Sequence, residues 1–511
     1  MTNTHNSAKR VAKNTGFLYI RMGITVFVSL YVTRLVLGTL GAEDFGIYSL
    51  VAGMVSMLVF LNAAMTAATQ RFMSYAQGER NLAKQKKIFN VSILLHFIIA
   101  IAVALLMELV GYFLLEGVLD IPIDRIAAAK LIFHFMVVST FFTIISVPYD
   151  AVVNAHENMF FVAITGVLES FLKLAVAIYI TYADYDKLII FGLLMAAIAI
   201  LMLIIKQVYC YKNYDEVKIN FNKYFDLPLL KEMGSFASWS FLTSSTSMLS
   251  FYGQGIVLNI FFGPIVNAAQ AISAQVSGQL SAFSTTMLKA LNPLLAKSEG
   301  GGDRALMLNA SIFGSKISSF LLMLFFIPVI VEMPYIFSLW LTDVPEFTII
   351  FCRLLLVKNL IEQLFLTLNS SILAVGNIKK YQIWKSLFQL IPLPICYLLF
   401  LNDFPAYTLY IIFIFQSVII GTVTLYFCKE YCDLSISDFI VNVVLRCMMT
   451  FILILGLTIC CSVFFTDDFY RLILVLMTSF ILFLFTVWFV GFNKKERATN
   501  RMFLSSYFSK T

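Results

Sequence analysis

Long apolar stretches recur along the whole chain, and no other feature of the sequence restricts its fold as strongly. A helix that crosses a bilayer needs roughly 20 apolar residues. Of the 511 residues, 60% are hydrophobic and only 13% are charged, whereas soluble domains carry about 25% charged residues. The stretches do not alternate as the strands of a membrane β-barrel would. The sequence therefore predicts an all-α polytopic membrane protein, and it argues against a soluble enzyme, a disordered chain or a disulfide-stapled module.

Fourteen spans can be placed, each long enough to cross a membrane as a helix. The connections between them are short, and none has room for an extramembrane domain. The spans cover residues 15–38, 46–70, 88–115, 127–150, 158–182, 187–211, 234–262, 265–292, 308–332, 347–374, 379–400, 405–428, 436–463 and 469–491.

Lysine and arginine gather in alternate connections between these spans. If the N-terminus is cytoplasmic, the inner connections hold Arg80, Lys84 and Lys297, whereas Asp44 and Asp184 lie outside. Cytoplasmic loops of membrane proteins carry an excess of Lys and Arg. We therefore expect both termini to be cytoplasmic. The net charge of +7 is then a signal of topology and does not indicate a nucleic-acid partner.

An internal repeat becomes visible when the sequence is shifted by 222 positions. Gly41 then falls on Gly263, between the first and second helix of each half, and Gly78 falls on Gly300. A similar match joins the fourth helix to the tenth. Six helices per half give both halves the same orientation, with a pseudo-two-fold axis along the membrane normal. The predicted divisions are a six-helix bundle at 1–212, a cytoplasmic linker at 213–230, a second six-helix bundle at 231–430, two additional helices at 431–491 and a cytoplasmic tail at 492–511.

Polar side chains at helical spacing mark the second, seventh and eighth spans. Polar groups inside a bilayer usually face protein or a water-filled cavity, so these stripes indicate a substrate site. The alternative is close packing of small residues with hydrogen bonds between helices. Gln275 and Gln279 lie on a different face of the eighth span. The residues predicted to bind substrate from these stripes are Asn62, Gln70, Ser240, Ser244, Gln254, Asn267, Gln270 and Ser277.

Two arginines, Arg21 and Arg34, lie inside the first apolar stretch. Either could extend its charged group to a membrane surface. Alternatively, a fixed guanidinium could bind an anionic head group, because its planar fork fits phosphate oxygens. Both are therefore candidate substrate-binding residues.

Two pairs of opposite charges stand four residues apart, at Glu169 and Lys173 and at Lys358 and Glu362. Charges one helical turn apart most simply neutralise each other. A buried carboxylate can also take up a proton near neutral pH. Glu169, Lys358 and Glu362 are therefore candidates for coupling to H+ or Na+.

The sequence shows no catalytic constellation. The four histidines are scattered, and no phosphate-binding GxxxxGK[ST] loop occurs. The eight cysteines include no paired CxxC array. We expect no enzyme activity, catalytic residue, cofactor or metal site.

Short motifs in both halves resemble the multidrug/oligosaccharidyl-lipid/polysaccharide flippase superfamily, and most closely its polysaccharide transporter branch. The motifs begin at Asn14-Thr-Gly-Phe-Leu, Thr33-Arg-Leu-Val-Leu-Gly and Asp44-Phe-Gly-Ile-Tyr-Ser-Leu in the first half. Leu368-Asn-Ser-Ser-Ile-Leu-Ala-Val-Gly resembles another family segment. Asn267-Ala-Ala-Gln departs from the usual tyrosine-containing turn, so the identity of the substrate is not inferred from that segment.

This resemblance implies two six-helix bundles around a central cavity, in the cytoplasmic (inner) membrane of a bacterium. It implies alternating access that carries an undecaprenyl-pyrophosphate-linked oligosaccharide to the outer leaflet, for O-antigen, capsule or exopolysaccharide synthesis. The partners would be the lipid-linked oligosaccharide, membrane lipids, a polysaccharide polymerase and glycosyltransferases. An ion-coupled multidrug antiporter of the same fold is the alternative. A membrane polymerase or ligase is disfavoured because it would need a large outer loop with reactive groups.

Overall fold

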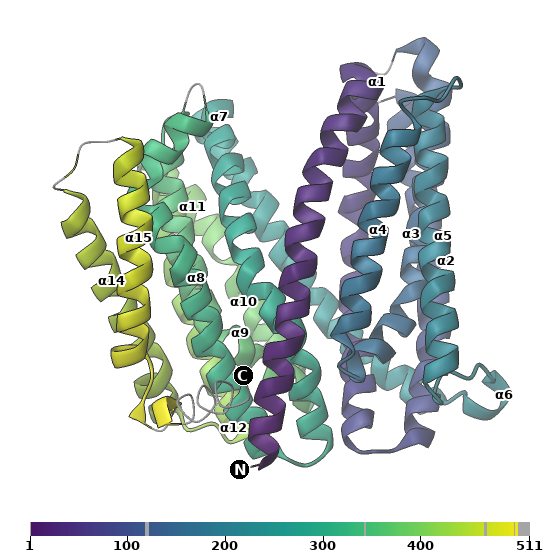
Figure 1. Cartoon of the computed structure of the whole chain (residues 1–511). Helices are drawn as coiled ribbons and strands as arrows, with labels where there is room; N and C mark the ends of the chain where they lie inside the picture. The colour runs from purple at the N-terminus through teal and green to yellow at the C-terminus, as the bar shows by residue number, and fades with distance from the viewer. Residues whose placement is uncertain are drawn as a thin grey trace, which may run out of the picture. The chain divides into compact units, whose positions relative to one another are not determined.

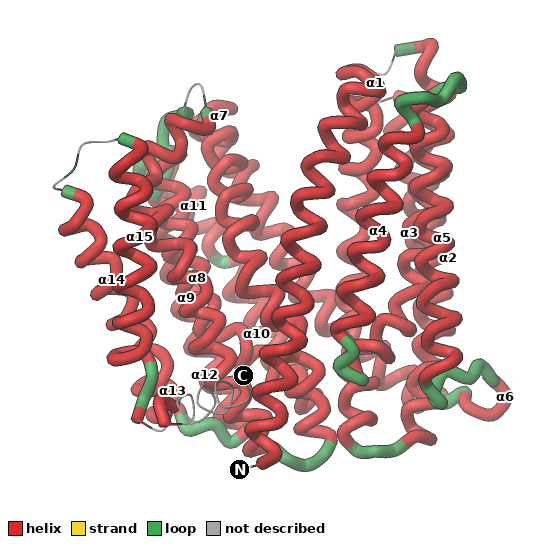
Figure 2. Tube along the Cα trace, viewed as in Figure 1, coloured by secondary structure: helices red, strands yellow, loops and turns green. Residues whose placement is uncertain are grey.

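A computed structural model describes residues 2–117, 122–341, 344–463, 465, 468–494 and 496–498. Within these ranges the chain is almost entirely helical and contains no strand (Figure 2). Ten of the described helices are long and apolar enough to cross a membrane by length and composition alone. The predicted all-α membrane fold is confirmed. The fourteen predicted spans fall on helices, and three of them, 379–400, 436–463 and 469–491, each cover more than one helical element.

The chain divides into two compact units. Unit 1 comprises Met1–Ser245 and Ala290–Leu306, and unit 2 comprises Thr246–Lys289 and Met307–Thr511. Helix α7 (Leu227–Gly300) contributes both of its ends to unit 1 and its middle to unit 2. The other elements of unit 1 are α1 (Thr2–Gly78), α2 (Leu82–Gly117), η1 (Ile123–Arg125), α3 (Ile126–Ala155), α4 (Met159–Tyr179), α5 (Lys187–Asn213) and α6 (Phe221–Tyr224).

Helices α1 and α7 each contain one residue that is not helical. Gly41 has φ 78° and ψ 173°, and Gly263 has φ 77° and ψ −172°. This backbone region is essentially open only to glycine. One glycine therefore replaces a loop between two spanning helices, and the repeat predicted from the 222-residue shift is confirmed at this position by matching dihedral angles.

Unit 1 packs around α3. Ala129, Ile132 and Phe133 of α3 are buried against Val103 and Met107 of α2. The entry of the chain into α4 and α5 is fixed by N-caps, since Asn158 accepts from the amide of Phe161 and Asp186 accepts from those of Leu188 and Ile189. Figure 1 shows α3, α4 and α5 lying along one another.

Unit 2 has its core between the middle of α7, α9 and α12. Leu258 and Ala269 of α7 pack with Phe351 of α9 and with Tyr410 and Phe413 of α12. The elements of this unit after α7 are α8 (Arg304–Trp340), which begins in unit 1, α9 (Thr348–Val375), α10 (Lys379–Leu390), α11 (Pro392–Phe400) and α12 (Thr408–Cys432). They are followed by α13 (Ile436–Phe439), a π-helical stretch η2 (Ile440–Leu445), α14 (Arg446–Ser462), α15 (Phe469–Thr486) and a second π-helical stretch η3 (Val487–Gly491).

The C-terminal pair of spanning helices is attached to α8 by two ion pairs. Near the start of α15, Arg471 Nε lies 2.9 Å from Glu332 Oε1. Beyond the end of η3, Glu496 Oε1 lies 2.8 Å from Lys316 Nζ. Lys316 and Glu332 are both fully buried in α8. We call α14 and α15, with their π-helical flanks, the C-terminal hairpin; it belongs to unit 2 and is held at both of its ends.

Candidate functional site

Arg21 is placed against helix α4 within unit 1. A methyl group built on Gly166 would lie only 2.8 Å from Nη2 of Arg21, so the guanidinium covers that glycine. Glu169 and Lys173 follow Gly166 at helical spacing, and their side chains form the expected ion pair at 2.6 Å. Arg34, thirteen residues further along α1, is exposed. The structure thus places Arg21 against a helix that also carries a predicted coupling residue, and leaves Arg34 apart.

The other candidates on α1 and on the first part of α7 are divided between the units, with Gln70, Ser240 and Ser244 in unit 1 and Gln254 in unit 2. Gln70 is half-buried, and the side chain of Asn62 lies outside the described residues. Ser240 is buried, and its backbone carbonyl accepts from the hydroxyl of Ser244 on the same helix. Gln254 is half-buried. The Ser244 hydroxyl therefore bonds back to its own helix, as serines inside helices commonly do.

The predicted polar face of the eighth span packs against protein. Ser277 Oγ accepts from Asn359 Nδ2 of α9 at 2.5 Å, and Ser284 Oγ donates to Gln363 Oε1 at 3.1 Å. Ser277 and Ser284 are buried. These residues follow the packing alternative, in which interhelical hydrogen bonds join two helices.

Asn267 and Gln270 also face a neighbouring segment of protein. A methyl group built on Gly255 would lie 3.3 Å from Asn267 Oδ1 and 3.1 Å from Gln270 Oε1. Since Gly255 precedes Gly263 and both amides follow it, the two parts of α7 fold back on each other at this glycine. Gln270 is buried in this contact and Asn267 is half-buried.

The opposite face of the same helix is exposed. Gln275, Gln279, Thr285 and Lys289 all have large accessible fractions. Polar and charged side chains exposed within a spanning helix face water or protein and not lipid tails. Sequence periodicity identified both faces, but it did not indicate which of them would be covered.

Lys358 and Glu362 of α9 form the expected pair, with Lys358 Nζ 2.8 Å from Glu362 Oε1. The same carboxylate oxygen accepts from Ser417 Oγ of α12 at 3.2 Å. The Glu362 side chain is 41% exposed. Glu362 is thus an accessible carboxylate with a cationic partner on its own helix and a hydroxyl partner on α12.

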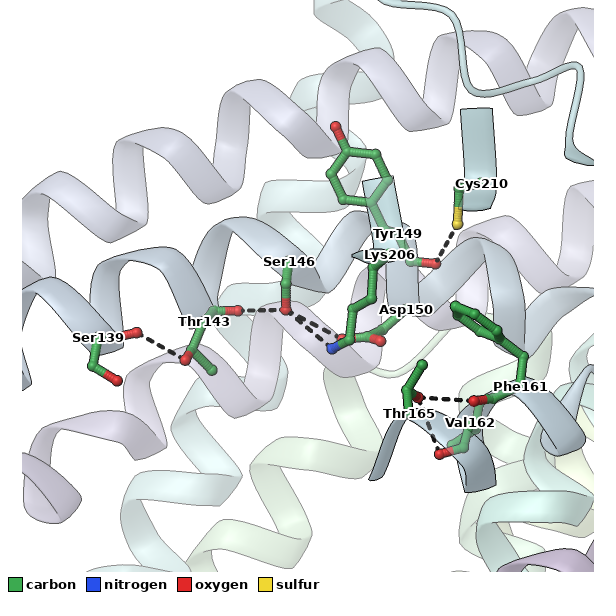
Figure 3. Close-up of polar contacts among 10 residues, drawn as sticks. All are labelled: Ser139, Thr143, Ser146, Tyr149, Asp150, Phe161, Val162, Thr165, Lys206 and Cys210. Atoms are coloured by element: carbon green, nitrogen blue, oxygen red, sulfur yellow. Dashed lines mark hydrogen bonds and ion pairs between the residues drawn. The ribbon is translucent and has the colours of Figure 1, made fainter. Parts of the chain in front are cut away.

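A comparable pair occurs in unit 1 and was not among the predicted site residues. Figure 3 shows Lys206 of α5 reaching Asp150 of α3, with Nζ 2.7 Å from Oδ2. Ser146, one turn before Asp150, donates to the same oxygen at 3.3 Å. The Asp150 side chain is 38% exposed. The available signal was Lys206 itself, a cation about two turns before the end of a 27-residue apolar helix.

The two carboxylates occupy equivalent helices. Counted within each half, α3 and α9 are the fourth spans, and α5 and α12 are the sixth. In both units a partly exposed acid on the fourth span contacts a polar side chain on the sixth, Lys206 in one and Ser417 in the other. Each unit therefore contains an accessible carboxylate on the fourth span of its half, although Asp150 and Glu362 are 212 positions apart and are not matched by the 222-position shift.

Within the described residues no group of three or more His, Cys, Asp or Glu side chains could hold a metal ion. The described geometry is therefore that of a polytopic helical protein with polar and ionisable side chains inside its spans.

The fold is shared with transporters of known structure. The chain resembles an outward-facing multidrug resistance MATE family transporter of the MOP superfamily with 13% identity and a TM-score of 0.71, covering 84% of this chain and 96% of that one. A MATE structure in a bent conformation gives 15% identity, a TM-score of 0.69 and the same coverage. A MOP superfamily transporter from Pyrococcus furiosus, for which a reversed polarity of the binding pocket suggests a different function, gives 14% identity and a TM-score of 0.66 over 85% of this chain and 96% of that one.

Residues 20–179 match the family model named MatE. This segment runs from the region of Arg21 to the end of α4 and includes Asp150 and Glu169. No curated protein sequence matches the chain. A segment at the N-terminal side of the chain thus matches the MatE model, and over most of its length the chain has the fold seen in MATE transporters.

Proposed function

We propose that this protein is an ion-coupled membrane exporter of small organic compounds. The observation that carries the proposal is the pair of accessible carboxylates, Asp150 and Glu362, on equivalent helices of the two units. Multidrug antiport requires an acid that water or an ion can reach, and both side chains are more than a third exposed. The MatE segment and the multidrug transporters among the similar structures support this class of substrate.

Ion coupling would work through competition at these carboxylates. The carboxylates of Asp150 and Glu362 each form an ion pair with a lysine, Lys206 or Lys358. Entry of a proton or Na+ would weaken that pair, and a cationic compound would compete for the same oxygen. If each carboxylate can bind either the ion or the exported compound, but not both, transport exchanges one for the other.

Flipping of a lipid-linked oligosaccharide is the second candidate. The exposed amides Gln275 and Gln279 favour it, with Lys289 further along the same face. A sugar head group needs many hydrogen-bonding partners and its pyrophosphate needs cations, for which Arg21 and Arg34 are available. A polymerase and glycosyltransferases would then be partners, and the termini and basic loops would lie in the cytoplasm.

Deletion of the gene separates the two candidates. Loss of a multidrug exporter raises the sensitivity of cells to cationic drugs and leaves glycolipids unchanged. Loss of a flippase leaves unexported lipid-linked repeat units on the cytoplasmic side and does not change drug sensitivity. Normal drug resistance together with accumulated glycolipid would overturn the multidrug proposal in favour of the flippase.

A further inference from the structure

The second spans of the two sequence repeats meet in unit 1 at a pair of glycines. Gly78 ends α1 and Gly300 ends α7. A methyl group built on Gly78 would lie 2.8 Å from the amide nitrogen of Gly301, and one built on Gly300 would lie 2.7 Å from the carbonyl carbon of Tyr75. Both methyl groups would also overlap a backbone carbonyl oxygen, that of Lys297 or of Tyr75 respectively. The backbones of α1 and α7 are therefore in direct contact here. At Gly78 and Gly300 there is room for a hydrogen atom on the α-carbon but not for a side chain.

The contact is reciprocal in sequence as well as in space. Gly78 meets Lys297, and Gly300 meets Tyr75. Gly78 is separated from Gly300, and Tyr75 from Lys297, by the same 222 positions that separate Gly41 from Gly263. Each repeat thus presents the same patch to the other, as in an isologous contact about a two-fold axis. We call this contact the glycine crossing.

A turn between α3 and α4 connects both sides of the glycine crossing. Glu157 Oε1 lies 3.3 Å from Lys297 Nζ, and the Glu157 side chain is only 2% exposed. Gln77, the residue before Gly78, has its amide nitrogen 3.4 Å from Nδ1 of His156. The turn itself is anchored, because the Glu157 carbonyl accepts from Asn14 Nδ2 at 3.1 Å.

The glycine crossing and the Glu157–Lys297 ion pair differ in how easily they separate. Close packing of glycine backbones is short-ranged, because it depends on van der Waals contact and weak Cα–H···O contacts. The Glu157–Lys297 pair is charged and largely shielded from solvent, so it holds the closed arrangement. Arg80, Lys84 and Lys87 lie at the same end of unit 1, which the distribution of basic residues predicts to be cytoplasmic.

We propose that the glycine crossing is the seal of a cytoplasmic gate, and that the Glu157–Lys297 ion pair is its latch. This proposal rests on the proposed transport function, since alternating access requires the two repeats to part at one end. The seal closes only with glycine at both positions. Opening breaks the Glu157–Lys297 pair and separates Tyr75 from Gly300.

A labelling experiment tests the gate without any substrate. Cys460 and Cys461 are the cysteines of the described residues that are not buried, so both are replaced by serine. Ala76, fully buried beside the crossing, is replaced by cysteine as a reporter. A membrane-impermeant maleimide is then applied to right-side-out and to inside-out vesicles.

In this reporter chain, Gly78→Ala or Gly300→Ala should raise the labelling rate about tenfold from the cytoplasmic side and leave it unchanged from the other, as a shift toward the open state requires. Glu157→Gln adds no bulk and should give a smaller increase from the same side. Gly278→Ala is the matched control, because Gly278 is exposed on α7 with no atom near its Cβ position.

Three results would overturn the gate: unchanged labelling in Glu157→Gln and in both glycine variants, an equal increase in Gly278→Ala, or labelling from the opposite side. Glu157→Gln keeps the test decisive if the glycine variants do not fold. Failure of the transport proposal is recognised separately, since drug and glycolipid assays on the deletion strain do not depend on labelling.

Discussion

Lys316, fully buried in α8, lies between the two carboxylate oxygens of Glu496, at 2.8 and 2.9 Å. The two residues are 180 positions apart. The backbone amide of Asn493 also donates to Glu496 at 2.7 Å, which orients the carboxylate. The chain after the last spanning helix is therefore part of the packing of unit 2.

Removing only one member of this pair should destabilise the protein. Lys316→Met leaves Glu496 without its cation, and loss of one partner of a buried pair costs about 3–5 kcal/mol, less where one partner is partly exposed. Glu496 is 17% exposed, so we expect a loss of stability at the lower end of this range. Thermal unfolding in detergent checks this, with exposed Lys289→Met as the control. A Lys316→Met/Glu496→Leu double variant should recover much of the loss; if it is worse than the single variant, the ion pair is not the cause.

The end of unit 1 that holds Arg125 should become less stable in acid. Arg125 bonds Asp44 at 2.5 Å and Asp186 at 2.6 Å. Partial burial opposes ionisation of Asp186, but hydrogen bonds from Arg125 and from backbone amides outweigh it, so its folded pKa is lowered. A lowered carboxyl pKa stabilises the fold above the unfolded value of about 3.9 and loses that contribution as the pH falls through the folded value.

Asp186→Asn isolates this charge, because asparagine is as good an N-cap as aspartate. We expect a loss of about 0.5 kcal/mol at pH 7, as is usual for partly exposed pairs, and the difference from wild type should shrink below about pH 4. Unfolding measured from pH 3 to pH 8 tests both points. If the difference instead grows toward low pH, ionised Asp186 does not stabilise the fold.

Gly41 and Gly263 should not tolerate alanine. Their dihedral angles are restricted to glycine, and strain of this kind costs of order 1–3 kcal/mol. No atom lies within 4 Å of either Cβ position, so a clash cannot explain a loss. Gly278→Ala, in ordinary helix with similar free space, should be neutral or stabilising. Equal effects at all three positions would show that the backbone angle does not matter.

Asp150→Asn should uncouple transport from its driving ion. The substitution keeps the volume but removes the charge that Lys206 contacts at 2.7 Å. In proteoliposomes with an imposed pH or Na+ gradient, we expect drug uptake to fall to about the rate without a gradient, and Glu362→Gln should act similarly. Asp438→Asn, an exposed acid at the start of α13, serves as the control. Gradient-driven uptake at the wild-type rate in both carboxylate variants would exclude them from coupling.

The two polar faces of the eighth span should respond differently to substitution. Asn359→Ala removes hydrogen bonds to Ser277 and Ser281, and such bonds between membrane helices are worth about 0.6 kcal/mol. Its effect should appear in stability. Gln275→Ala/Gln279→Ala alters an exposed face and should lower transport with an unchanged unfolding temperature. The reverse assignment would indicate that the covered face carries the substrate.

Helical periodicity and hydropathy predicted the elements of this fold well. All fourteen spans fall on helices, and the shift that aligned Gly41 with Gly263 is reproduced in their backbone angles. These features are local, because span length and glycine geometry depend on a few neighbouring residues.

The environment of polar side chains was harder to predict. In the eighth span both Ser277 and Gln279 are polar, and only the position of α9 determines which is covered. Lys316 has no partner nearby in sequence, because its partner belongs to the segment after α15. The proposed divisions of the chain and the roles of the binding residues remain predictions.

The double attachment of the C-terminal hairpin has a practical consequence. Cys460 is exposed near the end of α14, and the neighbouring helix α15 is held to α8 at Glu332 and beyond its end at Lys316. A fluorophore on this native thiol would therefore sit beside a helix that is attached to α8, and replacing the partly exposed Cys461 by serine would leave Cys460 as the labelling site for single-molecule spectroscopy.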